Sequence, residues 1–281
     1  MFRFFCWLIA MGFSLTAAAQ PLHVMSFNIR YDNPADSMNA WPHRKDKVVS
    51  QIRYHQVHIL GVQEALHHQM KDLQNGLKNF KSIGVGRDGG SQAEYAAIFY
   101  DTTRVALLKS NTFWLSETPD IVASKGWDAA LTRTASWGQF RDRLTGSVFF
   151  VFNTHLDHVG TTARRESARL LLQKAAAIAG DCPVMLTGDF NAHPQDEPIR
   201  LLLAKNNPYH FLDSRLVSLT PHYGPEGTFN GFKKQETADT PIDYIFVRGP
   251  IEVRDHATLS PTWKGRFASD HFAVLARINL K

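Results

Sequence analysis

Two short segments of this sequence combine acids, amides and an imidazole in a way that suits phosphate chemistry. Gly188–Asn191 (GDFN) follows an apolar run, and Ser269–His271 (SDH) lies near the C-terminus. Oxygen ligands beside an imidazole suit a hard divalent cation, and such a cation can assist water in cleaving a phosphate ester. The two segments predict a metal-assisted hydrolase, provided that the fold brings them together.

The same pattern recurs where other apolar runs begin or end. Polar side chains occupy these positions at Asn28, Glu64, His155, Asp189, Asn191 and Asp243. Buried strands carry ionisable groups at their ends only where something neutralises them. We therefore expect the strand ends to converge on one rim of the molecule.

Glu64 is the first candidate metal ligand, because an isolated carboxylate at the end of a buried strand is costly unless a cation compensates it. Its alternative role is to cap the helix expected to start near Leu66. Asp270 is expected to be a second carboxylate near the metal. The sequence has no Cys or paired-His zinc spacing. Mg²⁺ or Mn²⁺ is therefore the expected cofactor, and Ca²⁺ remains an alternative.

Asp189 and Asn191 are two positions apart on an expected extended turn, so their side chains project to the same side. Together they can hold a water molecule and a scissile phosphate. The alternative is that one of them caps a helix. His193-Pro194 follows directly and favours a shaped loop over a helix start.

His271 needs a partner that fixes its tautomer and charge, and Asp243 is the expected acceptor across adjacent strand ends. The pair then presents an imidazole to the phosphate. It can act as a general base or as a charged donor to the transition state, and the sequence does not choose between these roles.

Apolar runs predict a protein with many strands and a few helices. Strands are expected near 22–28, 57–63, 80–85, 95–100, 104–115, 131–140, 147–153, 183–188, 242–247, 251–258 and 272–279. Helices are expected over 42–56, 66–76, 159–179 and 196–204. This order predicts an α/β fold, a four-layer αββα sandwich of two mainly antiparallel sheets flanked by helices. Long polar loops are expected at 29–41, 116–130 and 205–240, where substrate selection usually resides.

The first 19 residues have the features of a cleaved signal peptide. Arg3 precedes an apolar stretch from Phe4 to Leu15, and Ala17–Ala19 supply a small-residue cleavage site. We expect residues 20–281 to form one domain located in the periplasm or secreted, with no stable membrane insertion. The formal charge of +5 falls to +4 in the mature chain because residues 1–19 contain Arg3 and no acid. This modest excess favours anionic substrates without singling out nucleic acid.

Seven motifs, in this order, resemble those of the endonuclease/exonuclease/phosphatase superfamily of metal-dependent phosphoesterases. They are SFNIR at 26–30, VQE at 62–64, EYAAIFY at 94–100, NTHLDH at 153–158, TGDFNAHP at 187–194, PIDYIFV at 241–247 and SDH at 269–271. The resemblance extends from Leu22 to Leu280. The segments 112–119 and 126–130 further resemble a secreted bacterial branch related to the deadenylases.

The resemblance implies roles for several residues. Asn28 helps to hold the metal and its waters, Asp189 orients or deprotonates the attacking water, and Asn191 binds the phosphate or a metal-bound water. His155 contacts the phosphate with help from Glu94. Arg133 directs a planar donor fork toward the same group, although a lone arginine is more often a surface charge.

These observations predict a secreted phosphoesterase in which water attacks phosphorus in line, and they favour a diester over a monoester as the substrate. The substrate classes are nucleic acid, with Lys233, Lys234 and Phe229 as groove candidates, and a phosphorylated sugar or inositol. A phospholipid head group ranks lower because no convincing apolar hairpin for membrane contact is evident. A non-catalytic binding protein is the alternative from another class. No obligate protein partner is evident.

Overall fold

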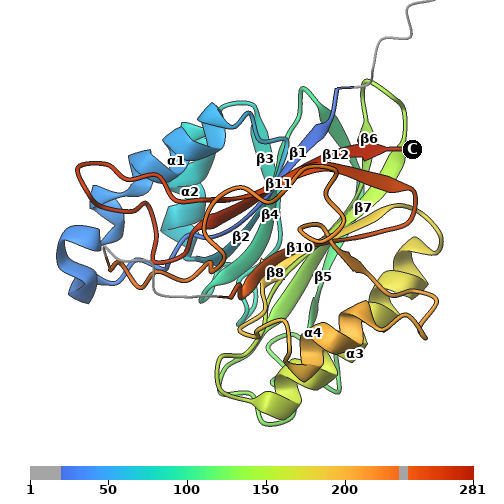
Figure 1. Ribbon diagram of the computed structural model, residues 1–281. Coiled ribbons are helices and arrows are strands. Elements are labelled where there is room, and N and C mark those ends of the chain that lie inside the picture. Colours follow the sequence, from blue (N-terminus) through green and yellow to red (C-terminus); the bar gives the residue numbers. More distant parts are fainter. Residues whose placement is uncertain (1–19, 234–239) are drawn as a thin grey trace, which may run out of the picture.

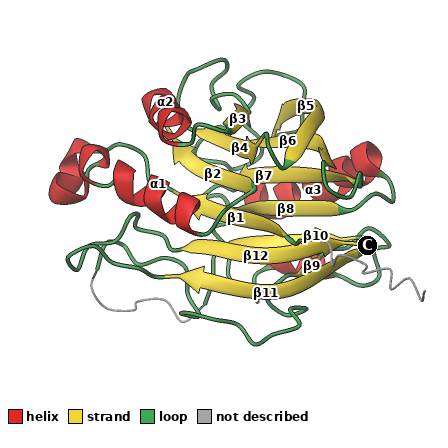
Figure 2. Ribbon diagram, turned by 90° about the horizontal axis from the view of Figure 1, so that it is seen from above, coloured by secondary structure: helices red, strands yellow, loops and turns green. Residues whose placement is uncertain are grey.

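The computed structural model describes residues 20–233 and 240–281. The predicted signal peptide at 1–19 and the predicted contact Lys234 lie outside the described residues. Two six-stranded sheets pack face to face, and helices cover the outer surface of each (Figure 1; Figure 2). The predicted α/β sandwich is therefore confirmed.

The first sheet has the strand order β11-β12-β1-β2-β4-β3. Its strands are β1 (Leu22–Asn28), β2 (Ile59–Ala65), β3 (Phe80–Ile83), β4 (Tyr95–Asp101), β11 (Ile251–Leu259) and β12 (Ala273–Leu280). The helices α1 (Lys45–Tyr54) and α2 (His67–Gly76) pack on its outer face through residues such as Val48, Ile52 and Leu73.

The second sheet has the order β5-β6-β7-β8-β10-β9. Its strands are β5 (Val105–Trp114), β6 (Thr134–Asp142), β7 (Val148–His155), β8 (Val184–Asp189), β9 (Leu212–Asp213) and β10 (Asp243–Arg248). The helices α3 (Thr161–Ala179) and α4 (Glu197–Leu203) cover its outer face through an apolar cluster that includes Leu171, Leu202 and Phe246.

Each sheet contains one parallel pair, β1 with β2 and β7 with β8, and its other neighbours are antiparallel. All the expected helices and strands are present, with shifted ends. Two features were not expected. The short strand β9 lies in the predicted loop 205–240, and the predicted loop 29–41 contains the 3₁₀ turn η1 (Pro34–Asn39), which continues into η2 (Trp41–His43). Both are too short to show a periodicity.

The space between the sheets is apolar, with a buried polar network at the end near the predicted site. Asn153 accepts hydrogen bonds from Gln63 Nε2 at 2.7 Å and Thr187 Oγ1 at 2.9 Å, and it donates to the carbonyls of Val62 and Ala97. The network therefore ties β2 to β7 and β8 just before Glu64, His155 and Asp189. These four hydrogen bonds to Asn153 favour one arrangement of the strands.

No helix in residues 20–233 or 240–281 has both the length and the apolar composition needed to cross a bilayer.

The polar network leaves room only for glycine at position 61, which generates a stability prediction. A Cβ at Gly61 would lie 2.2 Å from Thr187 Oγ1 and 2.5 Å from Asn153 Oδ1. We expect Gly61→Ala to lower the free energy of unfolding by about 1–3 kcal/mol, because overpacking forces these side chains apart. Urea unfolding of the purified protein measures this change. Ser110→Ala, on the exposed part of β5, is the control, and equal midpoints for Gly61→Ala and the wild type would contradict the argument.

Candidate active site

The strand directions bring the predicted residues to one rim. Asn28, His155 and Asp189 end β1, β7 and β8, and Glu64 lies near the end of β2. Asp243 opens the antiparallel strand β10 opposite Asp189, and His155 pairs with Asp189 on the other side. His271, Glu94 and Arg133 each precede a strand that starts at this rim, so sequence-distant side chains meet there.

A cavity of about 810 Å³ opens at this rim. Eight of the ten predicted residues line it, namely Glu64, Glu94, Arg133, His155, Asp189, Asn191, Asp270 and His271. The remaining two, Asn28 and Asp243, contact lining residues through hydrogen bonds to Glu64, Asp189 and His271. The structure therefore places the whole predicted set in or directly behind one cavity.

Asn28 joins the two carboxylates at the centre of the cavity. Its Nδ2 donates to Glu64 Oε1 and to Asp189 Oδ2, each at 2.9 Å. The backbone N–H of Arg30 donates to Asn28 Oδ1 at 3.0 Å, which fixes the orientation of the amide. The atom of Asn28 that faces the carboxylates is thus a nitrogen donor. In this arrangement Asn28 positions Glu64 and Asp189 and does not present an oxygen ligand to a metal ion between them.

Irregular backbone aims several of these side chains. Glu64 has a φ of 64°, and the pairing of β2 with β4 shifts register between Val62 and Ala65. Asn191 has a φ of 45°, and Arg30 has a φ of 56°. Non-glycine residues in the left-handed region are uncommon and cluster at functional sites. Glu64 does not cap α2, whose N-cap is Leu66, and instead accepts the N–H of Tyr31.

Asp189 is followed by a turn and not by a helix. Its Oδ1 accepts the backbone N–H of Asn191 at 2.9 Å, which closes an Asx turn, and the next helix, α4, has Asp196 as its N-cap. Asn191 Nδ2 lies 3.0 Å from the carbonyl of Leu156 and 3.1 Å from His155 Nε2. The GDFN segment is therefore the shaped loop that the sequence favoured.

His271 is held by two layers of contacts. Its Nδ1 lies 2.8 Å from Asp243 Oδ2, and its Nε2 lies 3.8 Å from Asp189 Oδ2. Thr228 Oγ1 in turn accepts the backbone N–H groups of Ile242 and Asp243 at 3.0 and 3.1 Å. The carbonyl of Thr228 also accepts the N–H of Phe272 at 2.6 Å. Thr228 thus fixes both strand ends that carry the Asp243–His271 pair.

Burial and charge set the protonation of these groups. Burial and the neighbouring Asp243 raise the pKa of Asp189 to about 7. Burial opposes the charge of His271, but Asp243, Asp189 and Asp270 outweigh it and hold its pKa well above the usual value. Burial and the nearby Arg133 hold the pKa of His155 well below its usual value. His271 is therefore suited to donate from a charged ring, and His155 is neutral.

The opposite part of the cavity contains arginines. Arg133 Nε lies 3.4 Å from Asp157 Oδ2, and its Nη2 lies 3.0 Å from His158 Nδ1. Arg87 Nη1 donates to Glu94 Oε2 at 2.9 Å. Both arginines line the cavity beside His155. This group of donors suits the oxygens of a phosphate.

Asp270 lies beside Arg30 and not inside the tightest group of candidate metal ligands. Its Oδ2 is 3.6 Å from Arg30 Nε, which also lies 3.0 Å from Asp36 Oδ2. Burial raises the pKa of Asp270, whereas nearby His271 lowers it. In this arrangement Asp270 contributes charge at the edge of the centre.

Sequence reasoning did not assign roles to several lining residues. They are Arg30, Tyr31, Asp36, Arg87, His158, Gly231 and Phe232. The sequence could have indicated Arg30 and His158, because they lie in the SFNIR and NTHLDH motifs. Arg87 and Asp36 lie in segments with no periodicity, so no local pattern indicated them. The predicted loops 29–41 and 205–240 both contribute to the cavity. No residue of the described loop 116–130 or of α3 lines it, and neither does Lys233.

The donor atoms fit a divalent cation. One ligand atom each from Glu64, Asp189 and His271 lies within 4.8 Å of the other two. Asp243 Oδ1 is buried and has no hydrogen-bond partner among the described residues. An excess of buried carboxylate oxygen is costly without a counter-charge, and carboxylates suit Mg²⁺ or Mn²⁺. Glu64 and Asp189 are therefore the residues best placed to hold such an ion.

The comparisons with known proteins agree with this geometry. Residues 25–271 match the model of the Endonuclease/Exonuclease/phosphatase family. The structure of an endonuclease/exonuclease/phosphatase from Bacteroides vulgatus is 40% identical, with a TM-score of 0.88, over 92% of this chain and 99% of that one. A mannosyl-6-phosphatase from Bacteroides thetaiotaomicron is 37% identical, with a TM-score of 0.87, over 92% and 99%.

The chain therefore belongs to the Endonuclease/Exonuclease/phosphatase family, whose members hydrolyse phosphoesters. A curated relative, Nocturnin of Drosophila melanogaster, is 29% identical over 171 residues, or 57% of this chain. The matched part spans 25% of that relative's length.

Thr228 offers a test of how the site is positioned. Thr228→Val keeps the shape of the side chain but removes the oxygen that accepts two backbone N–H groups, so Asp243 loses its fixed position behind His271. We expect a fall of about tenfold or more in kcat, with a smaller change in KM, because the loss of one such contact costs about 1–3 kcal/mol.

Thr228→Ser is the matched control, because it retains the oxygen and should keep most of the activity. Steady-state phosphoesterase kinetics and circular dichroism measure the effect. Equal losses in the valine and serine variants would show that packing, and not hydrogen bonding, matters at this position.

Proposed function

We propose that this chain is a divalent-metal-dependent phosphatase that removes phosphate from a phosphorylated sugar. One observation carries the proposal: a single cavity combines the carboxylate centre and the phosphate-binding arginines with side chains that suit a sugar. The ion pairs Arg30–Asp36 and Arg87–Glu94 offer planar partners for hydroxyl groups, and Phe229 offers an apolar face. The similarity to a mannosyl-6-phosphatase supports the same substrate class.

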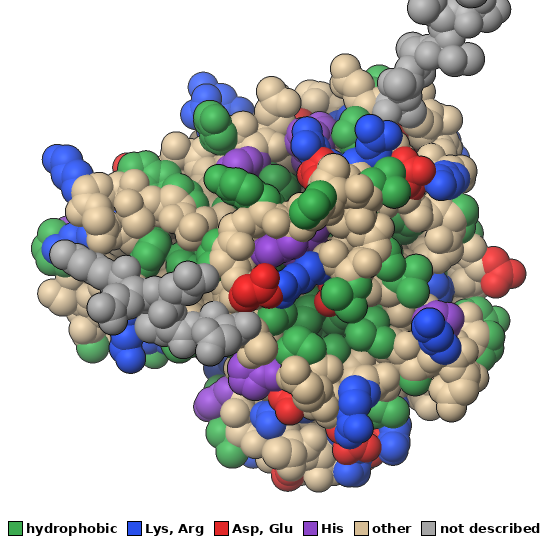
Figure 3. Space-filling view, viewed as in Figure 1, with side chains coloured by type: hydrophobic (Ala, Val, Ile, Leu, Met, Phe, Trp, Pro, Cys, Tyr) green, Lys and Arg blue, Asp and Glu red, His purple; other side chains and the backbone are tan. Residues whose placement is uncertain are grey.

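This proposal revises the sequence-based preference for a diester. A nuclease needs Lys and Arg side chains along the path of several phosphates. Of the described residues predicted to form such a groove, Phe229 lines the cavity and Lys233 does not. On the face shown in Figure 3, the Lys and Arg side chains that the structure describes occur in separate small groups among acidic and apolar ones. A small phosphomonoester fits these observations better than a polynucleotide.

The residues of the chain divide the chemistry among them. Glu64 and Asp189 would hold a divalent cation, which would neutralise charge on the phosphate and on the leaving oxygen. Arg133 and Asn191 bind non-bridging phosphate oxygens, and neutral His155 lies beside them. Asp189 orients the attacking water and accepts its proton.

The Asp243–His271 pair completes the arrangement. Asp243 keeps the imidazole of His271 in place and favours its charged form, so its ring N–H stabilises the negative charge that develops on the phosphate. Water gives a proton to Asp189 and forms the new bond to phosphorus, while the bond to the sugar oxygen breaks and that oxygen takes up a proton from solvent. Inorganic phosphate and the sugar are released, and Asp189 returns its proton to solvent. No covalent intermediate on the protein is needed.

A substrate screen tests the proposal. Purified protein with Mg²⁺ or Mn²⁺ is incubated with mannose 6-phosphate, glucose 6-phosphate, inositol phosphates, bis(p-nitrophenyl) phosphate, DNA, RNA and phospholipids. We expect phosphate release from at least one sugar monoester, loss of the rate after dialysis against EDTA, and recovery on adding Mg²⁺ or Mn²⁺. Hydrolysis of only a diester would overturn the proposed substrate class. Activity that survives dialysis against EDTA would exclude a metal-dependent mechanism.

Variants in the centre separate an enzyme from a binding protein on the same scaffold. Glu64→Ala, Asp189→Ala and His271→Ala should each lower kcat/KM by about 10²-fold or more, since each removes a charge or donor used in the transition state. His43→Ala, an exposed histidine on η2, is the control. If all three variants keep the wild-type rate, the protein is not a phosphatase of this kind.

We further propose that residues 1–19 are cleaved and that the enzyme acts in the periplasm or outside the cell. The small residues Ala17–Ala19 before Gln20 support cleavage at this point. N-terminal sequencing of protein recovered from cell fractions should find a chain that begins at Gln20 outside the cytoplasm. Recovery of intact Met1 chains from the cytoplasm alone would reject this location.

A further inference from the structure

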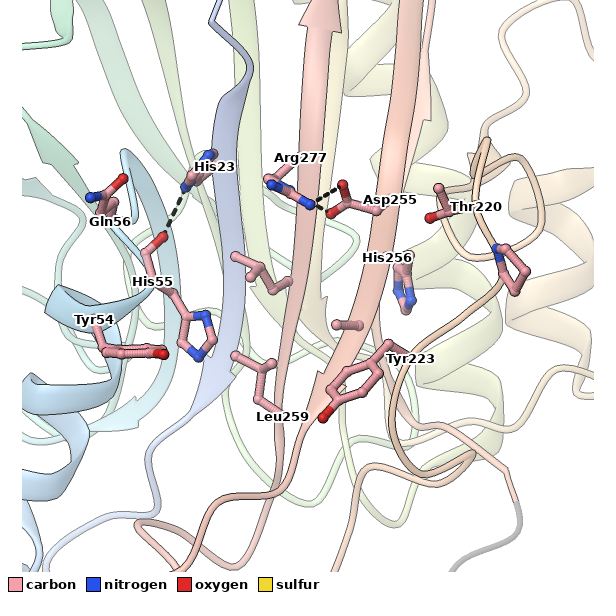
Figure 4. A pocket seen from close by; sticks show the side chains of 13 residues that line it. His23, Tyr54, His55, Gln56, Thr220, Tyr223, Asp255, His256, Leu259 and Arg277 are labelled. Atoms are coloured by element: carbon pink, nitrogen blue, oxygen red, sulfur yellow. Dashed lines mark hydrogen bonds and ion pairs between the residues drawn. The ribbon is translucent and has the colours of Figure 1, made fainter.

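A second groove lies on the outer face of the first sheet, away from the active site. Its floor is formed by β1, β12 and β11, including Leu259 and Leu275. The end of α1 borders one side, and the segment Thr220–Tyr223 borders the other (Figure 4). The groove encloses about 480 Å³ and shares no lining residue with the active-site cavity.

Two exposed tyrosine side chains lie on opposite sides of this groove. Tyr54 is 82% exposed and Tyr223 is 75% exposed. Figure 4 shows them on opposite sides of the groove, with Leu259 between them. Exposed aromatic surface is unfavourable in water, so a ligand that covers both rings gains affinity from them.

The backbone that carries Tyr223 is fixed by pairing with β11, and the Tyr54 ring contacts a neighbouring ring. Tyr223 N–H donates to the carbonyl of His256 at 3.1 Å, and Thr258 N–H donates to the carbonyl of Tyr223 at 2.8 Å, so this segment pairs with β11. The ring of Tyr54 packs edge-on against His55, with centroids 5.1 Å apart. Groups that are already ordered lose little entropy on binding.

The charged groups of the groove neutralise each other. Arg277 and Asp255 are its only Lys, Arg, Asp or Glu side chains, and Arg277 Nε and Nη2 lie 2.8 and 2.6 Å from the two Asp255 oxygens. Burial lowers the pKa of His256 to about 3 and, with His23 nearby, also lowers that of His55, so these rings add no charge at neutral pH. A groove without net charge does not select phosphate, nucleic acid or anionic lipid.

We propose that this groove is a binding site for a neutral oligosaccharide. A pyranose presents apolar C–H faces, which stack on tyrosine rings, and hydroxyl edges, which match the planar Arg277–Asp255 pair and the imidazoles of His23 and His55. The volume of the groove, about 480 Å³, lies in the range of small-ligand sites. The site goes beyond the proposed phosphatase chemistry and holds the protein to a glycan.

Affinity electrophoresis and titration calorimetry test this proposal without any need for catalysis. The full-length protein is run in native gels that contain mannan, dextran, galactan or xylan, and it is then titrated with the matching hexasaccharide. We expect retardation by at least one polysaccharide. Tyr54→Ala and Tyr223→Ala should each weaken the Kd by about tenfold or more. Tyr209→Ala, on the far side of the second sheet, is the matched control.

Three outcomes would overturn the inference. One is the absence of binding to every polysaccharide, and another is binding that the double variant Tyr54→Ala/Tyr223→Ala leaves intact. The third is a concentration-dependent dimer on gel filtration that the double variant abolishes, because the groove would then receive a second copy of the chain. Unchanged phosphatase kinetics and thermal unfolding in the tyrosine variants confirm that the loss of binding is local.

Discussion

The close approach of buried carboxylates at one rim is the constraint on which the rest of the site depends. Oxygens of Glu64 and Asp189 lie within 4.8 Å of each other, and Asp243 faces Asp189 from the next strand. Two unit charges at about 4 Å repel by about 4 kcal/mol at the effective dielectric constant near a protein surface. Asn28, His271 and Arg30 offset part of this repulsion, whereas burial and the nearby Asp243 raise the pKa of Asp189. The divalent cation that we propose at this centre would offset the remaining negative charge and would supply the positive charge that phosphate cleavage needs.

The sheets hold this unfavourable arrangement through register. His155, Asp189 and Asp243 occupy facing positions on three neighbouring strands. A slip of one residue would turn these side chains toward the opposite face of the sheet. The polar network of Gln63, Asn153 and Thr187 lies directly behind them and permits only one pairing of the strands. The network therefore helps to hold the strand ends, and the side chains that they carry, in fixed positions at the rim.

The sequence predicted the sandwich and the membership of the site because both depend on local signals. Apolar runs identify buried strands, and polar residues at their ends, such as Asp189 and His155, identify the rim. Other features depend on contacts that no local pattern records. The orientation of the Asn28 amide is set by the backbone of Arg30, and the support from Thr228 crosses from a loop to two strands. Arg87 reaches the cavity from an irregular segment, so its role could be seen only in three dimensions.

The segment between β9 and β10 contributes residues to both the active-site cavity and the outer groove. Its first part pairs with the edge strand β11, where Leu219 N–H donates to the carbonyl of Val253 at 3.0 Å, and this contact covers an edge that would otherwise be open to another strand. Tyr223 then faces the outer groove, and a few residues later Thr228 and Phe229 reach the active site. Because the same segment is anchored to both sheets, changes in its sequence can alter the ligand of either site while the carboxylate centre stays in place. Long loops on a rigid scaffold are where substrate choice diverges, and in this chain the segment lines both the active-site cavity and the outer groove.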